Sequence, residues 1–348
     1  MMKLKRIAAV ILAGALCASA FTGCGINKDA KAASMKGQTV TLGVANFMCR
    51  YQQAALEDQY RMYLGNEEIW SQTLGGDSTI EDSVKDSAME QLHEMYTLKA
   101  HMDDYKIEFT DEDKTAVEEA AKKFIEANSG DTLEEMGADQ EIVEEVLTLY
   151  TIRSKMKKAI EAEADTNVSD EEANKRGYSM VKIATDSRTD ENGTQTEYTD
   201  EEKAGLKEDA RKMEAELKED GATLSGVAKA HNQEVTTGAY AADDTQLEEA
   251  VRKELDALKE GETSGLIETE SALYFVKLDA ETDEEATKQN RETIINTRKS
   301  EKYQEVLEGW QKKDGWEVEE KALAKIVFKN SLTQTDPNAA TENMESTQ

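Results

Sequence analysis

Cysteine and histidine, which often act as nucleophiles, transition-metal ligands or proton carriers near neutral pH, are scarce in this sequence. Its 348 residues include three cysteines and three histidines. His93 and His101 lie eight residues apart in a segment with helical periodicity, so they do not share one tight helical face. His231 lies far from both along the chain. The sequence therefore predicts neither a metal site nor a cofactor.

Cys24 has surroundings that indicate a covalent modification. Three basic residues in the first six positions precede an uncharged apolar run, residues 7–20, and small residues follow it. This run is too short to span a bilayer comfortably, and the pattern is typical of a signal peptide, which we assign to residues 1–23. The segment Phe21-Thr22-Gly23-Cys24 resembles the lipobox that precedes a diacylglycerol-modified cysteine, although Phe21 stands where Leu is usual.

Cleavage before Cys24 would make this residue the new N-terminus. Acylation there adds more than one chain, which durable anchoring requires. We therefore predict a lipid anchor at Cys24, a polar tether over residues 24–38, and a location at the extracytoplasmic face of the cell membrane. Cys17 leaves with the signal peptide, so Cys49 alone remains and no intrachain disulfide is expected.

The acidity of the chain limits the classes of molecule that it is expected to bind. The formal net charge is -31, and removal of the three basic residues before Cys24 takes it to -34. Such a protein repels phosphate backbones, so a nucleic-acid partner is not expected. The single proline, Pro337, lies in a polar tail over residues 330–348 that we predict to be disordered.

Helical periodicity dominates residues 39–168. A short strand is predicted at residues 39–42, followed by helices over residues 47–65 and 80–105. Thr110 and Asp113 form a capping pair for a third helix. The apolar residues of a fourth helix are Ile142, Val146, Leu149, Met156 and Ile160. We interpret the Met and Tyr residues of these stripes as core rather than as a cofactor site.

The pattern changes after Val168. Ser169 and Glu172 would cap a short helix, and a strand is predicted over residues 178–184 with Val181 and Ile183 on one face. The further predicted elements are helices over 199–218, 224–230 and 244–259, a hairpin of 263–267 with 273–278, a helix over 281–313 and a last strand over 322–328.

A lone C-terminal helix cannot form a domain, so residues 281–329 should pack back on the helices of residues 39–168. The α+β module of residues 169–280 would then be an insertion. The predicted fold class is therefore mostly α with an inserted α+β domain.

This layout resembles the PrsA/SurA group of extracytoplasmic foldases, in which a parvulin-type prolyl isomerase domain interrupts a helical chaperone domain. The resemblance covers roughly residues 39–328. The stretch Leu258-Lys-Glu-Gly-Glu-Thr-Ser264 and the strand Ala272-Leu-Tyr-Phe-Val-Lys-Leu278 resemble the parvulin ending, and residues 178–185 resemble its opening strand. The resemblance implies a SurA-N-like helical domain and a four-stranded parvulin-like (PpiC) domain.

The sequence departs from the parvulin pattern at its polar positions. By the resemblance, the two strand histidines fall on Met180 and Tyr274, and the central-loop Asp or Cys falls near His231. Leu247 and Val251, one helical turn apart, match the apolar pair of the proline pocket. The groups left to donate hydrogen bonds are Tyr274, Thr269 and His231, and ordinary core packing of a degenerate domain explains these residues equally well.

We therefore predict a membrane-anchored foldase that acts mainly as a holdase for unfolded exported polypeptides. Phe47, Tyr51, Met95 and Tyr96 are candidates for a partly open apolar cleft in the helical domain. An active parvulin-type isomerase is the second hypothesis, so the sequence leaves open whether the chain is an enzyme. A solute-binding lipoprotein is the third, although the helical first third argues against two α/β lobes.

Overall fold

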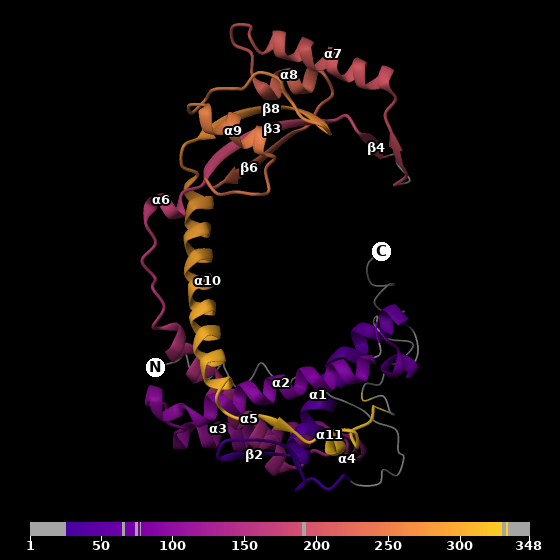
Figure 1. Cartoon of the computed structure of the whole chain (residues 1–348), viewed down its shortest axis with the longest axis vertical. Coiled ribbons are helices and arrows are strands. Elements are labelled where there is room, and N and C mark those ends of the chain that lie inside the picture. The colour runs from indigo at the N-terminus through magenta and orange to yellow at the C-terminus, as the bar shows by residue number, and fades with distance from the viewer. Residues whose placement is uncertain are drawn as a thin grey trace. The chain divides into compact units, whose positions relative to one another are not determined.

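The structure, a computed structural model, describes residues 26–64, 67–73, 76, 78–189, 193–328 and 332, with side chains left out at residues 58–68. The predicted signal peptide and Cys24 lie outside these residues. The chain divides into two compact units, unit 1 of residues 1–164 and 299–348 and unit 2 of residues 165–298 (Figure 1). Unit 2 interrupts unit 1 in the sequence and carries a four-stranded sheet, so the predicted fold class is confirmed.

Unit 1 is largely helical. Its helices up to the insertion are α1 (Leu42–Leu64), η2 (Glu67–Ser71), α2 (Ile80–Ala100), η3 (Met102–Tyr105), α3 (Asp111–Ala127), α4 (Gly130–Met136) and α5 (Gln140–Glu161). The predicted Thr110 and Asp113 pair forms a capping box at the start of α3, because each side chain accepts a hydrogen bond from the other residue's backbone N–H. In the part of the chain that the structure describes, no helix combines the length and apolarity needed to cross a membrane.

A small antiparallel sheet closes unit 1, in the order β2 (Gln38–Thr41), β1 (Lys31–Met35) and β9 (Glu317–Val318). Ala32 and Ala33 are fully buried in it. The predicted tether over residues 24–38 is therefore wrong from Lys31 onward. Small residues suit a tether, but here they let the strand pack closely on the core.

The chain returns to unit 1 through α10 (Glu284–Gln311), whose residues from Lys299 onward count with unit 1. Tyr303 and Leu307 of α10 pack in one buried cluster with Leu98, Ile152 and Met156. After β9, a short helix, α11 (Glu320–Leu323), takes the first two residues of the strand predicted over residues 322–328, and the other five lie in a turn or outside regular structure, so that strand is wrong. The predicted disordered tail also departs from the structure at Leu332, which is fully buried.

Unit 2 is built on an antiparallel sheet in the order β6 (Val235–Tyr240), β3 (Arg176–Ala184), β8 (Ala272–Ala280) and β7 (Ile267–Glu268). Strand β6 lies where the sequence predicted no strand. Its other elements are α6 (Asp170–Ala173), β4 (Ser187–Thr189), β5 (Gln195–Glu197), α7 (Asp200–Glu216), α8 (Leu224–Ala230), α9 (Glu249–Ala257) and the first half of α10. The predicted module therefore ended too early at residue 280, because that half of α10 belongs to unit 2.

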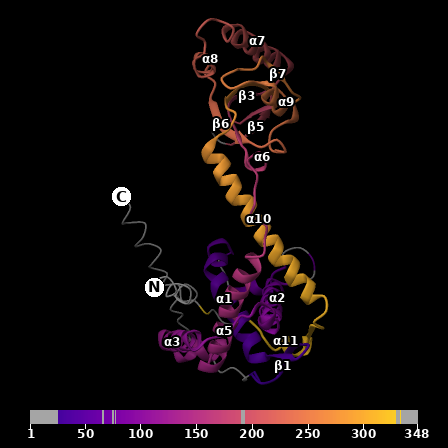
Figure 2. The same cartoon turned by 90° about the vertical axis from the view of Figure 1, so that its left-hand side faces the viewer.

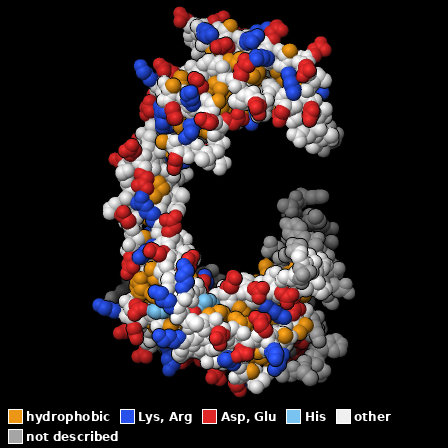
Figure 3. All heavy atoms as spheres, viewed as in Figure 1, with side chains coloured by type: hydrophobic (Ala, Val, Ile, Leu, Met, Phe, Trp, Pro, Cys, Tyr) orange, Lys and Arg blue, Asp and Glu red, His pale blue; other side chains and the backbone are white. Residues whose placement is uncertain are grey.

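Local signals in unit 2 explain several helix starts. Ser169 accepts a hydrogen bond from the backbone N–H of Glu172, and Thr199 with Glu202 forms a full capping box. Helix α9 begins at Glu249, five residues later than the predicted start at Asp244. On the face shown in Figure 3, acidic and basic side chains are interspersed over each unit, as expected for a soluble, strongly charged surface.

Candidate functional site

The two faces of the unit 2 sheet carry different layers. Because side chains alternate along a strand, Val181 and Ile183 of β3 face a cluster formed with α7 and α8. Tyr178 and Met180 belong to the other face, which packs against α9 (Figure 2). The predicted alternation of β3 therefore divides the unit into two cores, and the candidate site lies on the α9 face.

Met180 and Tyr274 share that α9 face. In the register of β3 and β8, Met180 pairs with Val276 and Tyr274 pairs with Lys182. The two residues are thus diagonal neighbours on one face, within reach of long side chains. Two of the three predicted catalytic positions are brought together, although neither carries histidine.

Tyr274 is buried and its hydroxyl is already paired. The hydroxyl donates to Glu248 Oε1 at 2.5 Å, and Lys182 Nζ lies 5.6 Å from the ring centroid. Burial, followed by the hydrogen bond and charge of Glu248, raises the pKa of Tyr274 well above its usual value. The hydroxyl therefore stays protonated, and its one proton is committed to Glu248.

The predicted apolar pair completes this face. Val251 of α9 is buried there, and half-buried Leu247 and Met180 pack against the same cluster. The α9 face is thus a largely apolar surface that includes three tyrosines, Tyr178, Tyr240 and Tyr274, and the hydroxyl of Tyr274 is already paired. Such a surface can hold an apolar side chain but offers few hydrogen bonds to a bound amide.

His231 does not join this site, which corrects its predicted role. It caps the end of α8, where its Nδ1 lies 3.1 Å from Asp209 and its Nε2 lies 3.1 Å from Glu216. The hydrogen bonds that His231 makes to the carboxylates of Glu216 and, next, Asp209 raise its pKa above the ordinary value. The residue follows α8, which packs on the opposite face of the sheet from Tyr274. Its role is to tie α8 to α7.

The hydroxyl of Thr269 also has a structural role. Its Oγ1 donates to the carbonyl of Ala272 at 3.0 Å and accepts from the Ala272 N–H at 3.2 Å. These bonds close the turn between β7 and β8. Thr269 therefore shapes the hairpin that carries Tyr274.

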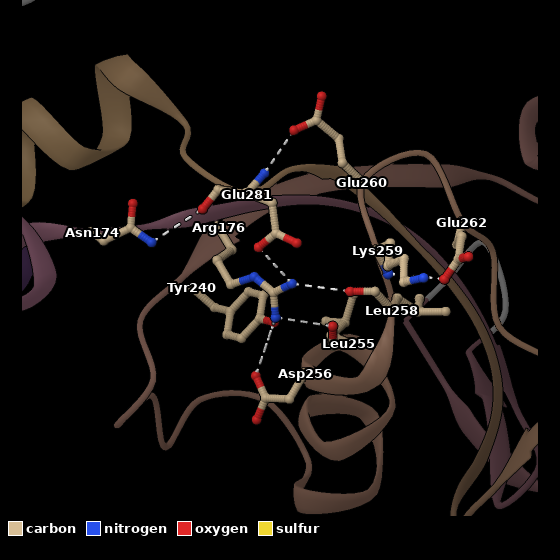
Figure 4. Close-up of polar contacts among 10 residues, drawn as sticks. All are labelled: Asn174, Arg176, Tyr240, Leu255, Asp256, Leu258, Lys259, Glu260, Glu262 and Glu281. Atoms are coloured by element: carbon tan, nitrogen blue, oxygen red, sulfur yellow. Dashed lines mark hydrogen bonds and ion pairs between the residues drawn. The ribbon is translucent and has the colours of Figure 1, made fainter.

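Arg176 and Tyr240 form a polar anchor at one end of this face that the sequence did not reveal (Figure 4). Arg176 donates to the Tyr240 hydroxyl at 2.9 Å and to the carbonyls of Leu255 and Leu258 at 3.2 and 3.1 Å. The Tyr240 hydroxyl donates to Asp256 at 3.0 Å. Burial, with the hydrogen bond to Asp256, raises the pKa of Tyr240 to about 12.

This anchor satisfies carbonyls at the end of α9 and fixes that helix against β3 and β6. No sequence motif marks Arg176, because its partners are distant in the chain. Glu248 was missed as well. Its position just before α9 was the available signal, since acidic residues are common at helix starts.

Among the described residues, no group of three or more His, Cys, Asp or Glu side chains could hold a metal ion.

Cys49 is buried in unit 1, and burial raises the pKa of its thiol to about 12. The thiol is therefore a core group at neutral pH and not a nucleophile.

A small apolar pocket lies between α1 and α5 of unit 1, with a volume of about 10 Å³, which is room for about one water molecule. Its lining residues are Phe47, Met48, Tyr51, Val143, Val146, Leu147 and Tyr150. Two predicted cleft residues, Phe47 and Tyr51, are among them. The other two predicted cleft residues, Met95 and Tyr96, do not line it. Both are buried in the core, and the Tyr96 hydroxyl donates to Glu145.

Residues 186–290 match the family described as the PPIC-type PPIASE domain (Rotamase_2). This segment of unit 2 is therefore similar to a PPIC-type domain. The match spans unit 2 from β4 to the first turns of α10, so it includes Tyr274 and Val251 but not β3 with Met180. Together with the helical unit that this segment interrupts, the family match confirms the predicted resemblance to PrsA/SurA-type foldases. No curated protein matches the chain.

Solved structures with some likeness to the chain include foldases and chaperones. The foldase protein PrsA from Lactococcus lactis is 17% identical, with a TM-score of 0.33 over 87% of this chain and 99% of that one. A peptidylprolyl isomerase, PrsA from Bacillus cereus, is 20% identical, with a TM-score of 0.30 over 72% and 93%. One of two SurA-like chaperones from Campylobacter jejuni is 12% identical, with a TM-score of 0.29 over 83% and 99%. The PPIC-type assignment rests on the family match alone.

Proposed function

We propose that the chain is a membrane-anchored extracytoplasmic foldase that holds unfolded exported polypeptides. The observation that carries this proposal is a segment that matches the PPIC-type family and interrupts a separate helical unit. The small pocket of the helical unit is lined by aromatic, Met and branched side chains, which can repack to admit apolar side chains of different clients.

A physical argument favours the binding of unfolded polypeptide over the catalysis of prolyl isomerisation as the main function. Rotation about an X-Pro bond loses amide resonance, and the barrier is about 18–20 kcal/mol. A catalyst must bind the twisted amide better than the planar one, which requires polar groups near the carbonyl. On the α9 face, Met180 offers no donor and the proton of Tyr274 is committed to Glu248. The face therefore binds both planar isomers about equally and leaves the barrier unchanged.

An active isomerase is the second candidate, favoured by the match of unit 2 to PPIC-type PPIases. A protease-coupled prolyl isomerisation assay on the chain from Gly25 onward distinguishes the two candidate functions. We expect the unmodified chain to suppress aggregation of a reduced, unfolded client but to accelerate isomerisation very little.

A gain of catalysis provides the complementary test. Met180→His with Tyr274→His places two histidines as diagonal neighbours on the α9 face, so any residual isomerase activity should rise. The matched control, Ser179→His with Tyr274→His, directs one histidine to the other face and should give no gain. Robust isomerisation by the unmodified chain would reverse the order of the two candidates.

The anchor at Cys24 is a separate prediction, because this residue lies outside the described part of the chain. A Cys24→Ser variant cannot be acylated, so it should move almost completely from the membrane fraction to the soluble or secreted fraction. Immunoblots of separated fractions measure this shift, and equal Trp fluorescence spectra would show that folding is unchanged. A Cys24→Ser protein that stays in the membrane fraction contradicts the lipid anchor.

A further inference from the structure

After α11, the described residues 325–328 and 332 of unit 1 lie in no helix or strand. We name these residues the strap: Lys325, Ile326, Val327, Phe328 and Leu332. Ile326, Phe328 and Leu332 are buried, whereas the Val327 side chain between them is 41% exposed. This alternation is typical of an extended peptide with one face against a surface.

The strap places its apolar side chains in the main core of unit 1. Phe328 lies edge-on to Trp70 with ring centroids 5.2 Å apart, and Arg50 lies over its ring at 5.7 Å. Ile326 and Leu332 join the same cluster as α1 and α2. The strap thus fills a groove formed by helices that come much earlier in the chain.

The backbone of the strap is held by buried charged side chains rather than by a neighbouring strand. Arg50 Nη1 donates to the Val327 carbonyl at 3.2 Å. The Phe328 N–H donates to Glu81 at 3.1 Å, and the Leu332 N–H donates to Glu57 at 2.8 Å. Contacts to backbone atoms do not depend on the identity of the side chain, so they would serve another sequence equally well.

These charged groups keep partners of their own beneath the strap. Arg50 pairs with Glu135 at 3.0 Å, and Gln53 donates to Glu57 at 2.9 Å. Lys85 pairs with Glu81 at 2.5 Å. Departure of the strap would therefore leave the polar groups of the groove paired and in place, so the groove is organised before any ligand enters.

We propose that this groove is a binding site for extended polypeptide and that the strap occupies it in cis. The ligand class is a segment with apolar residues at alternate positions and flanking basic residues, as in Lys325-Ile-Val-Phe-Lys329. The charge of the chain, -31 overall, favours such cationic segments. A polypeptide that displaces the strap gains the same backbone contacts, and the strap limits access until it leaves.

This inference deepens the proposed function, since it assigns a client site and a regulator to the foldase. Its test uses the chain from Gly25 onward and a fluorescent peptide with the sequence of residues 325–334. We expect Phe328→Ala to bind this peptide on the order of tenfold more tightly than the unmodified chain, because the competing strap is seated less of the time. A peptide with Ile326→Asp and Phe328→Asp should bind to neither chain.

Two matched controls separate strap release from general destabilisation. Val327→Ala changes the exposed neighbour on the strap, and Leu307→Ala creates a cavity at a residue as buried as Phe328 but outside the groove. Neither should tighten peptide binding. Phe328→Leu, which keeps most of the volume but loses the ring contacts to Trp70 and Arg50, should give a smaller gain if Phe328→Ala does not fold.

The inference is overturned if the strap variants bind the peptide no more tightly than Val327→Ala, or if Leu307→Ala gives the same gain. It is also overturned if the Asp-substituted peptide binds equally well. Failure of the proposed function looks different, because the peptide would then still bind while no variant suppresses aggregation of an unfolded client.

Discussion

Arg176→Ala is expected to destabilise unit 2 by roughly 3 kcal/mol, one of the two largest effects predicted for this chain. The guanidinium pairs with Glu281 at 2.9 Å and binds the Tyr240 hydroxyl and two carbonyls at the end of α9. Removal of the fork takes one donor from each of these acceptors, although the Leu255 carbonyl keeps the N–H of Leu258, and it loosens the attachment of α9 to the sheet. Arg176→Lys should restore little, because an ammonium cannot reach several acceptors in one plane.

The three tryptophans make the readout specific to each unit. Trp70, Trp310 and Trp316 all lie in unit 1, so Trp fluorescence follows that unit alone. In urea, Arg176→Ala should split the far-UV circular dichroism transition while the Trp transition stays where it was. Arg188→Ala is the matched control, since its exposed pair with Glu202 should contribute little to the stability of unit 2. A shift of both transitions together, or equal effects of the two variants, would contradict the anchor.

The sequence predicts those features that depend on neighbouring residues. Capping residues such as Thr110 and Thr199 act within one helical turn, so the starts of α3 and α7 are predictable. Alternation along β3 likewise predicts which side chains share a face, and this brings Met180 and Tyr274 together.

Features that depend on distant partners are not predictable in this way. Strand β1 resembles a tether in sequence because its residues are mostly small or polar. It pairs with the adjacent β2 on one side, but its partner on the other side, β9, lies nearly the whole chain away. The placement of His231 fails for a similar reason, because Asp209 and Glu216 of α7 decide where it lies. Arg176 gives no local signal, since each of its contacts comes from another element.

The central claim is that unit 1 holds unfolded polypeptide without help from the PPIC-type domain. Unit 1 has its own core, which includes Ile160 before the insertion and Tyr303 after it. Glu163 and Lys302 pair across the insertion point at 3.8 Å, so a short Gly/Ser linker can join Ala164 to Lys299. The chain without residues 165–298 should therefore fold, and a single Trp fluorescence transition in urea would verify this.

The decisive measurement is suppression of aggregation of a reduced, unfolded client, compared per mole for three proteins. These are the chain from Gly25 onward, the same chain without residues 165–298, and residues 165–298 alone. We predict that the chain without residues 165–298 retains most of the suppression and that the isolated domain shows little, because the apolar pocket between α1 and α5 and the larger apolar core belong to unit 1. Suppression confined to residues 165–298 would contradict the account.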